Sequence, residues 1–135
     1  MIAADASVIV RYLVGSPATQ AVAAAALVDS PEMVIGVSPV ALIECAHVLR
    51  SQYQVPRRAI IDALIDLVQR ENVRVLGLRT ESVVEVLVRA RSLPGRPIPD
   101  ALIVAAAIGG GATALATFDR GQGRYGFPVM EPGGS

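Results

Sequence analysis

A chain of 135 residues with 53% hydrophobic residues is long enough for one sizeable core, so we expect a single domain over residues 1–135. Its 12 basic and 12 acidic residues balance, which excludes a strongly basic nucleic-acid binder, and every base is arginine, which excludes any mechanism that needs a lysine. The single cysteine, Cys45, and the lack of a long uncharged apolar run favour a cytoplasmic protein without a membrane span.

The first half of the chain alternates short apolar runs with helical segments. Ile2 to Ala4 reads as a strand that ends at Asp5, and Ser7 is predicted to cap the helix that follows, up to Val14. Prolines mark the starts of the next three predicted helices, which cover residues 18–28, 40–52 and 56–68. Continuous apolar runs predict two further strands, residues 33–37 and 73–76.

The second half continues this alternation. Thr80 is predicted to cap a helix over residues 81–91, and the next helix begins at Pro99 and is apolar on all sides up to Gly109. The glycine-rich segment 120–126 is predicted to be a mobile loop. Two more strands are expected over residues 114–118 and 129–130, and residues 131–135 are expected to fray. Apolar strands separated by helices predict a parallel sheet covered on both faces.

Four acidic residues stand inside or directly against strongly apolar segments: Asp5, Glu44, Asp100 and Asp119. Asp5 and Asp119 follow strands, whose carboxyl ends converge at the ligand site of open α/β sheets. Asp100 lies in the first turn of one helix and Glu44 lies within another. Each has an ordinary explanation as a cap, a turn residue or the edge of a buried face. Gathered in one low-dielectric cleft, however, they would repel one another strongly.

A hard divalent cation relieves that repulsion, and ligands that are oxygen alone select Mg²⁺ or Mn²⁺ over zinc or copper. Thr117 lies two residues before Asp119, so its hydroxyl is expected on the same side of the strand. Ser7 lies two residues after Asp5 and is expected to reach the same site. A metal-bound water loses its proton more readily, and it can then attack phosphorus.

The chain resembles PIN-domain ribonucleases of the VapC toxin type. Four segments carry the resemblance in order along the chain: Asp5-Ala6-Ser7-Val8, Ser38 to Glu44, Ile98 to Ile103, and Thr117-Phe118-Asp119-Arg120. The resemblance implies a three-layer α/β/α domain with a central, mostly parallel sheet of four to five strands. It also implies a Mg²⁺- or Mn²⁺-dependent endoribonuclease in which Asp5, Glu44, Asp100 and Asp119 hold the metal, helped by Thr117.

The same resemblance implies partners. Proteins of this type are typically toxins paired with a small antitoxin whose C-terminal segment covers the cleft, and they commonly form homodimers. The apolar faces of the helices around residues 18–28 and 40–52 are the expected dimer contact.

RNA must approach this acidic cleft, and arginines near the acids are candidates for phosphate contacts. The RNA-binding candidates are Ser7, Arg11, Arg96, Arg120 and Arg124, although each arginine is equally well an ordinary surface charge. Tyr125 and Phe127 are candidates for base stacking, with core packing favoured for Phe127.

Other interpretations fit the residues less well. Receiver domains and haloacid-dehalogenase-type phosphatases are also α/β proteins with acid clusters, but both need a lysine that this chain lacks. His47 follows Glu44 at the spacing of di-iron bundles, yet no second Glu-x-x-His pair is present, so His47 is not expected to be a ligand. Cys45 is expected to be a small core residue. The alternative function is an inactive module that binds RNA or an antitoxin without cleavage, and the presence of all four acids favours the nuclease.

Overall fold

In the computed structural model, which describes residues 1–133, the first of two units spans Met1–Leu76. Its three strands pair in parallel in the order β1-β2-β3: β1 (Ile2–Ala4), β2 (Ile35–Val37) and β3 (Val73–Val75). The register pairs Ala4 with Val37 and Val37 with Val75, so all three strands end at the same edge of the sheet. Asp5, directly after β1, therefore stands at that edge.

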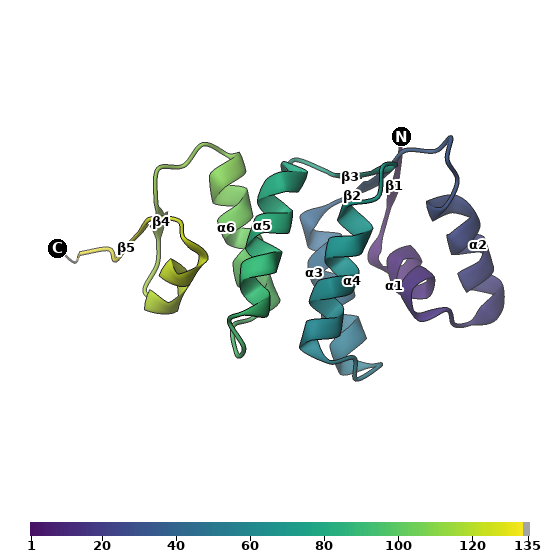
Figure 1. Cartoon of the computed structure of the whole chain (residues 1–135), viewed down its shortest axis with the longest axis horizontal. Helices are drawn as coiled ribbons and strands as arrows, with labels where there is room; N and C mark the ends of the chain where they lie inside the picture. Colours follow the sequence, from purple (N-terminus) through teal and green to yellow (C-terminus); the bar gives the residue numbers. More distant parts are fainter. Residues whose placement is uncertain (134–135) are drawn as a thin grey trace. The chain divides into compact units, whose positions relative to one another are not determined.

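Four helices complete the first unit: α1 (Ala6–Val14), α2 (Ala18–Val28), α3 (Pro39–Ser51) and α4 (Arg57–Val68). In the view of Figure 1, β1 lies between the α1–α2 pair and the α3–α4 pair. The predicted apolar stripe of α4 is confirmed, because all six of its members are buried: Ile60, Ile61, Leu64, Ile65, Leu67 and Val68.

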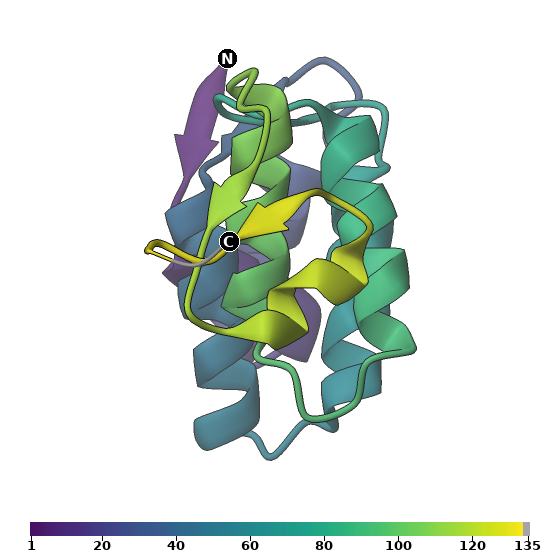
Figure 2. The ribbon, with the colours of Figure 1, turned by 90° about the vertical axis from the view of Figure 1, so that its left-hand side faces the viewer.

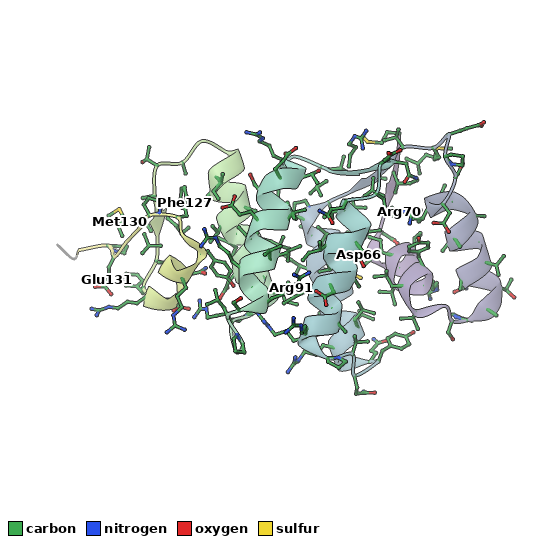
Figure 3. All side chains as sticks on the ribbon, in the orientation of Figure 1. Asp66, Arg70, Arg91, Phe127, Met130 and Glu131 are labelled. Atoms are coloured by element: carbon green, nitrogen blue, oxygen red, sulfur yellow. The ribbon has the colours of Figure 1, made fainter. Side chains whose placement is uncertain are left out.

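Two polar clusters hold the loops of this unit in place. The Asn72 side chain donates hydrogen bonds to the carbonyls of Val28, Ser30 and Met33, at 2.8, 3.2 and 3.1 Å, and so fixes the connection from α2 to β2. Arg70, just beyond α4 (Figure 3), donates to Asp29 at 2.6 Å. Asp29 also accepts a hydrogen bond from the Tyr12 hydroxyl at 2.7 Å.

The second unit begins at Gly77. The helices α5 (Thr80–Arg91) and α6 (Ile98–Gly109) pack side by side, and the strands β4 (Leu115–Ala116) and β5 (Val129–Met130) pair in parallel. A 3₁₀-helix, η1 (Arg120–Tyr125), joins them and contacts both α5 and α6. Figure 2 shows η1, β4 and β5 lying over the α5–α6 pair.

The α/β fold with parallel strands is confirmed, but the predicted central sheet of four to five strands is wrong. β4 pairs with β5 in a separate sheet of two strands. Each of these strands is two residues long, and the backbone of β4 is satisfied by β5: Leu115 donates to Pro128 O and Thr117 to Met130 O, both at 2.9 Å. The expectation of a single domain over residues 1–135 stays a prediction.

Several local expectations also need correction. Asp5, not Ser7, caps α1, and α5 begins at Thr80 without a side-chain cap. The segment predicted to be a mobile loop forms η1, because Asp119 caps it and Tyr125 anchors it in the core with 2% exposure. The apolar composition of α6 predicts burial nearly all round, but the helix has an exposed side, since Ile103 is 47% exposed.

Of the end expected to fray, residues 134 and 135 lie outside the described part of the chain. Among residues 1–133, no helix combines the length and the apolarity needed to cross a bilayer.

Candidate active site

Arg96 brings two of the four acids together in the second unit. Its Nη2 atom donates to Asp100 Oδ2 at 3.0 Å and to Asp119 Oδ2 at 2.8 Å, and its Nη1 atom donates to Asp119 Oδ1 at 3.1 Å. The contact with Asp119 thus uses both carboxylate oxygens in the fork geometry that guanidinium groups favour. Two carboxylates that lie 19 positions apart in the sequence therefore share one cation.

Local structure explains why these side chains meet. Pro97 precedes α6, which places Asp100 in the first helical turn. Asp119 follows β4 and caps η1, where its Oδ1 atom accepts the Gly121 amide at 2.9 Å. Thr117 orients Asp119, because the Thr117 hydroxyl accepts the Asp119 amide at 2.9 Å. The Thr117 side chain thus contacts the Asp119 backbone, and the predicted help of Thr117 in holding a metal stays a prediction.

The cluster of Arg96, Asp100 and Asp119 is partly shielded from solvent. The side chains of Arg96 and Asp100 are 16% and 22% exposed, whereas Asp119 is 53% exposed. The hydrogen bond from Arg96, together with the Gly121 amide, lowers the pKa of the Asp119 carboxyl. The same bond raises the pKa of the Arg96 guanidinium, with smaller contributions from the charges of Asp119 and Asp100. One guanidinium, that of Arg96, thus contacts the two acidic side chains of Asp100 and Asp119.

Asp5 is held firmly in the first unit. Its Oδ1 atom accepts hydrogen bonds from the Ser7 hydroxyl at 2.6 Å, the Ser7 amide at 3.0 Å and the Val8 amide at 3.3 Å. The Ser7 hydroxyl and then the Val8 amide lower the pKa of the Asp5 carboxyl. Oδ2 of Asp5 accepts no hydrogen bond from any described residue. The carboxylate is therefore ionised, fixed in orientation and open at one oxygen.

Glu44 lies on the solvent side of α3. Ser38 begins this helix by accepting the Ala41 amide at 3.0 Å. Glu44 and His47 are exposed, whereas Cys45 is fully buried, and burial raises the pKa of the Cys45 thiol to about 12. The core position predicted for Cys45 is confirmed. Because Asp5 and Asp119 are exposed as well, the low-dielectric argument applies only to the partly buried Asp100.

The oxygen donors of these acids suit Mg²⁺ or Mn²⁺ in kind. Within residues 1–133, however, no group of three or more Asp, Glu, His or Cys side chains is arranged to hold a metal ion. Arg96 engages both oxygens of Asp119 and one oxygen of Asp100. The oxygen donors fit a divalent ion in kind, and in the second unit the cation that binds Asp100 and Asp119 is the Arg96 guanidinium.

Comparison of the sequence with protein-family models gives the family of this chain. The family model described as the PIN domain matches residues 2–128, which include all four acids. The chain belongs to the PIN domain family. PIN domains are generally nucleases and usually use divalent metals. Comparison with curated proteins and with solved structures gave no match.

A cavity beside Asp5 holds two of the RNA-binding candidates of this PIN domain. It has a volume of about 390 Å³ and is lined by residues of α1 and α2: Ser7, Val8, Arg11, Gln20, Ala23, Ala24 and Leu27. Arg11 Nη1 donates to Ser7 O at 3.1 Å, and Arg11 Nε donates to the Gln20 side chain. The guanidinium is thereby fixed in a lining that also holds the apolar side chains of Val8 and Leu27.

The other candidates of the PIN domain lie on or beside η1. Arg120 and Arg124 are exposed. Tyr125 is buried, so its predicted role in base stacking is wrong. Phe127, whose position is labelled in Figure 3, is half-buried by its accessible surface. Sequence reasoning missed Phe118, an aromatic side chain that is 76% exposed directly before Asp119. The signal available in the sequence was its place between the two polar residues Thr117 and Asp119.

Proposed function

We propose that this PIN domain is a Mg²⁺- or Mn²⁺-dependent endoribonuclease. Asp5, Glu44, Asp100 and Asp119 would hold the metal, with Thr117 orienting Asp119. The observation that carries the proposal is the convergence of Asp100 and Asp119 on one cation, at 3.0 and 2.8 Å from Arg96 Nη2. When bound, the metal makes a water molecule more acidic and offsets negative charge on the phosphate.

The family match supports the assignment of all four acids, because residues 2–128 include each of them. Asp5 supports it independently. Its Oδ1 atom is fully used by α1, whereas Oδ2 is open to a cation. A carboxylate already fixed by the backbone loses little freedom when it binds a metal.

RNA would contact arginines and one aromatic ring. Arg11 lines the cavity beside Asp5 together with polar and apolar side chains, and a guanidinium there suits a nucleotide, since it can pair with phosphate or stack on a base. Phe118 offers an exposed ring for stacking, next to Asp119. Arg120 and Arg124 are exposed cations for the flanking phosphates.

We further propose that the protein is the toxin of a toxin–antitoxin pair and forms a homodimer. The resemblance to VapC-type toxins supports the toxin role and a small antitoxin partner. Two exposed valines support the dimer: Val22 on α2 is 70% exposed and Val40 on α3 is 64% exposed. Sedimentation at micromolar concentration should give a dimer, and Val22→Asp with Val40→Asp should give a monomer.

Cleavage of RNA with and without a chelator tests the nuclease. We expect cutting with Mg²⁺ or Mn²⁺, none with EDTA, and recovery when metal is added back. Asp100→Asn should reduce cutting by at least about 100-fold, since it removes a charged metal ligand. RNA cleavage at the same rate with and without EDTA would contradict the metal mechanism. Binding of RNA without any cleavage would favour the inactive binding module instead.

A further inference from the structure

Arg96 lies in a different environment from Arg120 and Arg124, two of the other arginines considered for RNA. Arg120 and Arg124 are exposed, whereas the Arg96 side chain is only 16% exposed and is turned onto two carboxylates. Charge-assisted contacts of this kind are the stronger class of hydrogen bond, and burial strengthens them further. Binding of an RNA phosphate does not require an arginine that is mostly buried and already bound to two carboxylates.

We infer that Arg96 is an internal counter-ion of the metal site: it neutralises Asp100 and Asp119 in the metal-free protein and is displaced when the divalent ion binds. The inference rests on the proposed function. Its basis is that the guanidinium binds both oxygens of Asp119 and Oδ2 of Asp100, and these are two of the carboxylates that would hold the metal. A dication and a guanidinium on the same oxygens would also repel each other.

The Arg96 guanidinium lies directly against Gly121. A Cβ atom at position 121 would lie 2.9 Å from Arg96 Cζ and 3.1 Å from Asp119 Oδ1. The distance of 2.9 Å to Arg96 Cζ is shorter than real Cβ atoms essentially ever show. The backbone at Gly121 does not have a positive φ, so its conformation is open to other residues. A side chain at position 121 is therefore accommodated when the Arg96 guanidinium, the far end of a flexible side chain, moves away.

Two functional consequences follow. In the metal-free protein, Asp100 and Asp119 are held near each other without mutual repulsion, because one positive charge lies on both. Metal must compete with Arg96, which weakens the apparent affinity of the metal and raises the metal concentration at which the site is half-occupied. Arg96 thus acts on the reaction through the carboxylates and is a positioning residue.

Binding of Mn²⁺ alone, followed by electron paramagnetic resonance and calorimetry on the full chain, tests the inference without RNA. Arg96→Gln removes the competitor, and we expect an apparent dissociation constant about tenfold lower, or about 1.4 kcal/mol. Gly121→Ala leaves the charge of the site unchanged but pushes the guanidinium away, so it should also tighten binding. Arg79→Gln is the matched control. It removes one charge from the same unit, from a side chain that is 76% exposed and whose ion pair is with Glu81, and it should leave the affinity within twofold.

Unchanged or weaker Mn²⁺ binding in both Arg96→Gln and Gly121→Ala would overturn the inference. If Asp119→Asn abolishes binding in that case, the proposed metal site stands and only the counter-ion role fails. If neither the wild-type protein nor Arg96→Gln binds Mn²⁺, both proposals fail. Equal gains in Arg96→Gln and Arg79→Gln would also overturn the inference, because net charge alone would then explain the effect. Circular dichroism confirms that each variant is folded.

Discussion

Substitution of Asp5 can separate its role as a helix cap from its proposed role as a metal ligand. Asn and Asp are equally good N-caps, and Asn keeps an Oδ1 acceptor for the Ser7 and Val8 amides. It replaces Oδ2, the oxygen open to metal, with an NH₂ group. We expect Asp5→Asn to lose about 0.5 kcal/mol, for the charge at the helix N-terminus. Asp5→Ala also loses the cap, for a total of about 1.5 kcal/mol.

Thermal denaturation and RNA cleavage measure the two effects in parallel. For a domain of this size, about 1 kcal/mol corresponds to about 4 °C in Tm, so Asp5→Ala should melt well below Asp5→Asn. Cleavage should fall by at least about 100-fold in both variants, because both lack the charged ligand. Equal melting temperatures would refute the capping argument. Wild-type cleavage by Asp5→Asn would refute the metal assignment of Asp5.

Three further predictions follow from the described contacts. Cys45, whose thiol pKa is raised to about 12 by burial, should not react with Ellman's reagent at pH 8 until urea unfolds the protein. Asn72→Ala should cost about 1–3 kcal/mol in urea denaturation, since three carbonyls lose their shared donor. The pKa values of the Asp5 and Asp119 carboxyls are lower in the folded protein than the ordinary value of 3.8. The two ionised carboxylates therefore add to the free energy of unfolding above pH 3.8, and this stabilisation is lost as the pH falls through their folded pKa values. Urea titrations at pH 6 and pH 3 should show this loss, and Asp5→Asn should show less of it.

The helices could be predicted because their signals are local. The apolar spacing of α4 marks its buried face, and Ser38-Pro39 marks the start of α3. Strand pairing is not local, and β4 has only two residues with which to specify a partner. Its apolar run predicted a strand correctly, but nothing in that run distinguishes a central sheet from pairing with β5.

The acids of the candidate site were also found from local signals, whereas their partners were not. Arg96 lies four residues before Asp100, a spacing at which side chains pair on a helix. Pro97 and Pro99 lie between them, and prolines argue against a continuous helix there, so the sequence did not suggest this ion pair. Its contact with Asp119 spans 23 residues and depends on how η1 folds back onto α6. Ser7 and Asp5 are both good caps in sequence, and only the geometry shows which one accepts the amides.

Asp5 and Asp119 show that a structural role and a metal-binding role need not compete for the same residue. Each follows a strand, and in each the Oδ1 atom accepts the amide two residues later, from Ser7 and Gly121 respectively. That bond fixes the carboxylate plane and leaves Oδ2 to one side. In Asp119 the Oδ2 atom already holds a cation, Arg96 Nη2 at 2.8 Å, and in Asp5 it is open. A cap at the end of a strand is therefore a means of aiming one oxygen, so explaining these acids as caps supports the metal-site proposal.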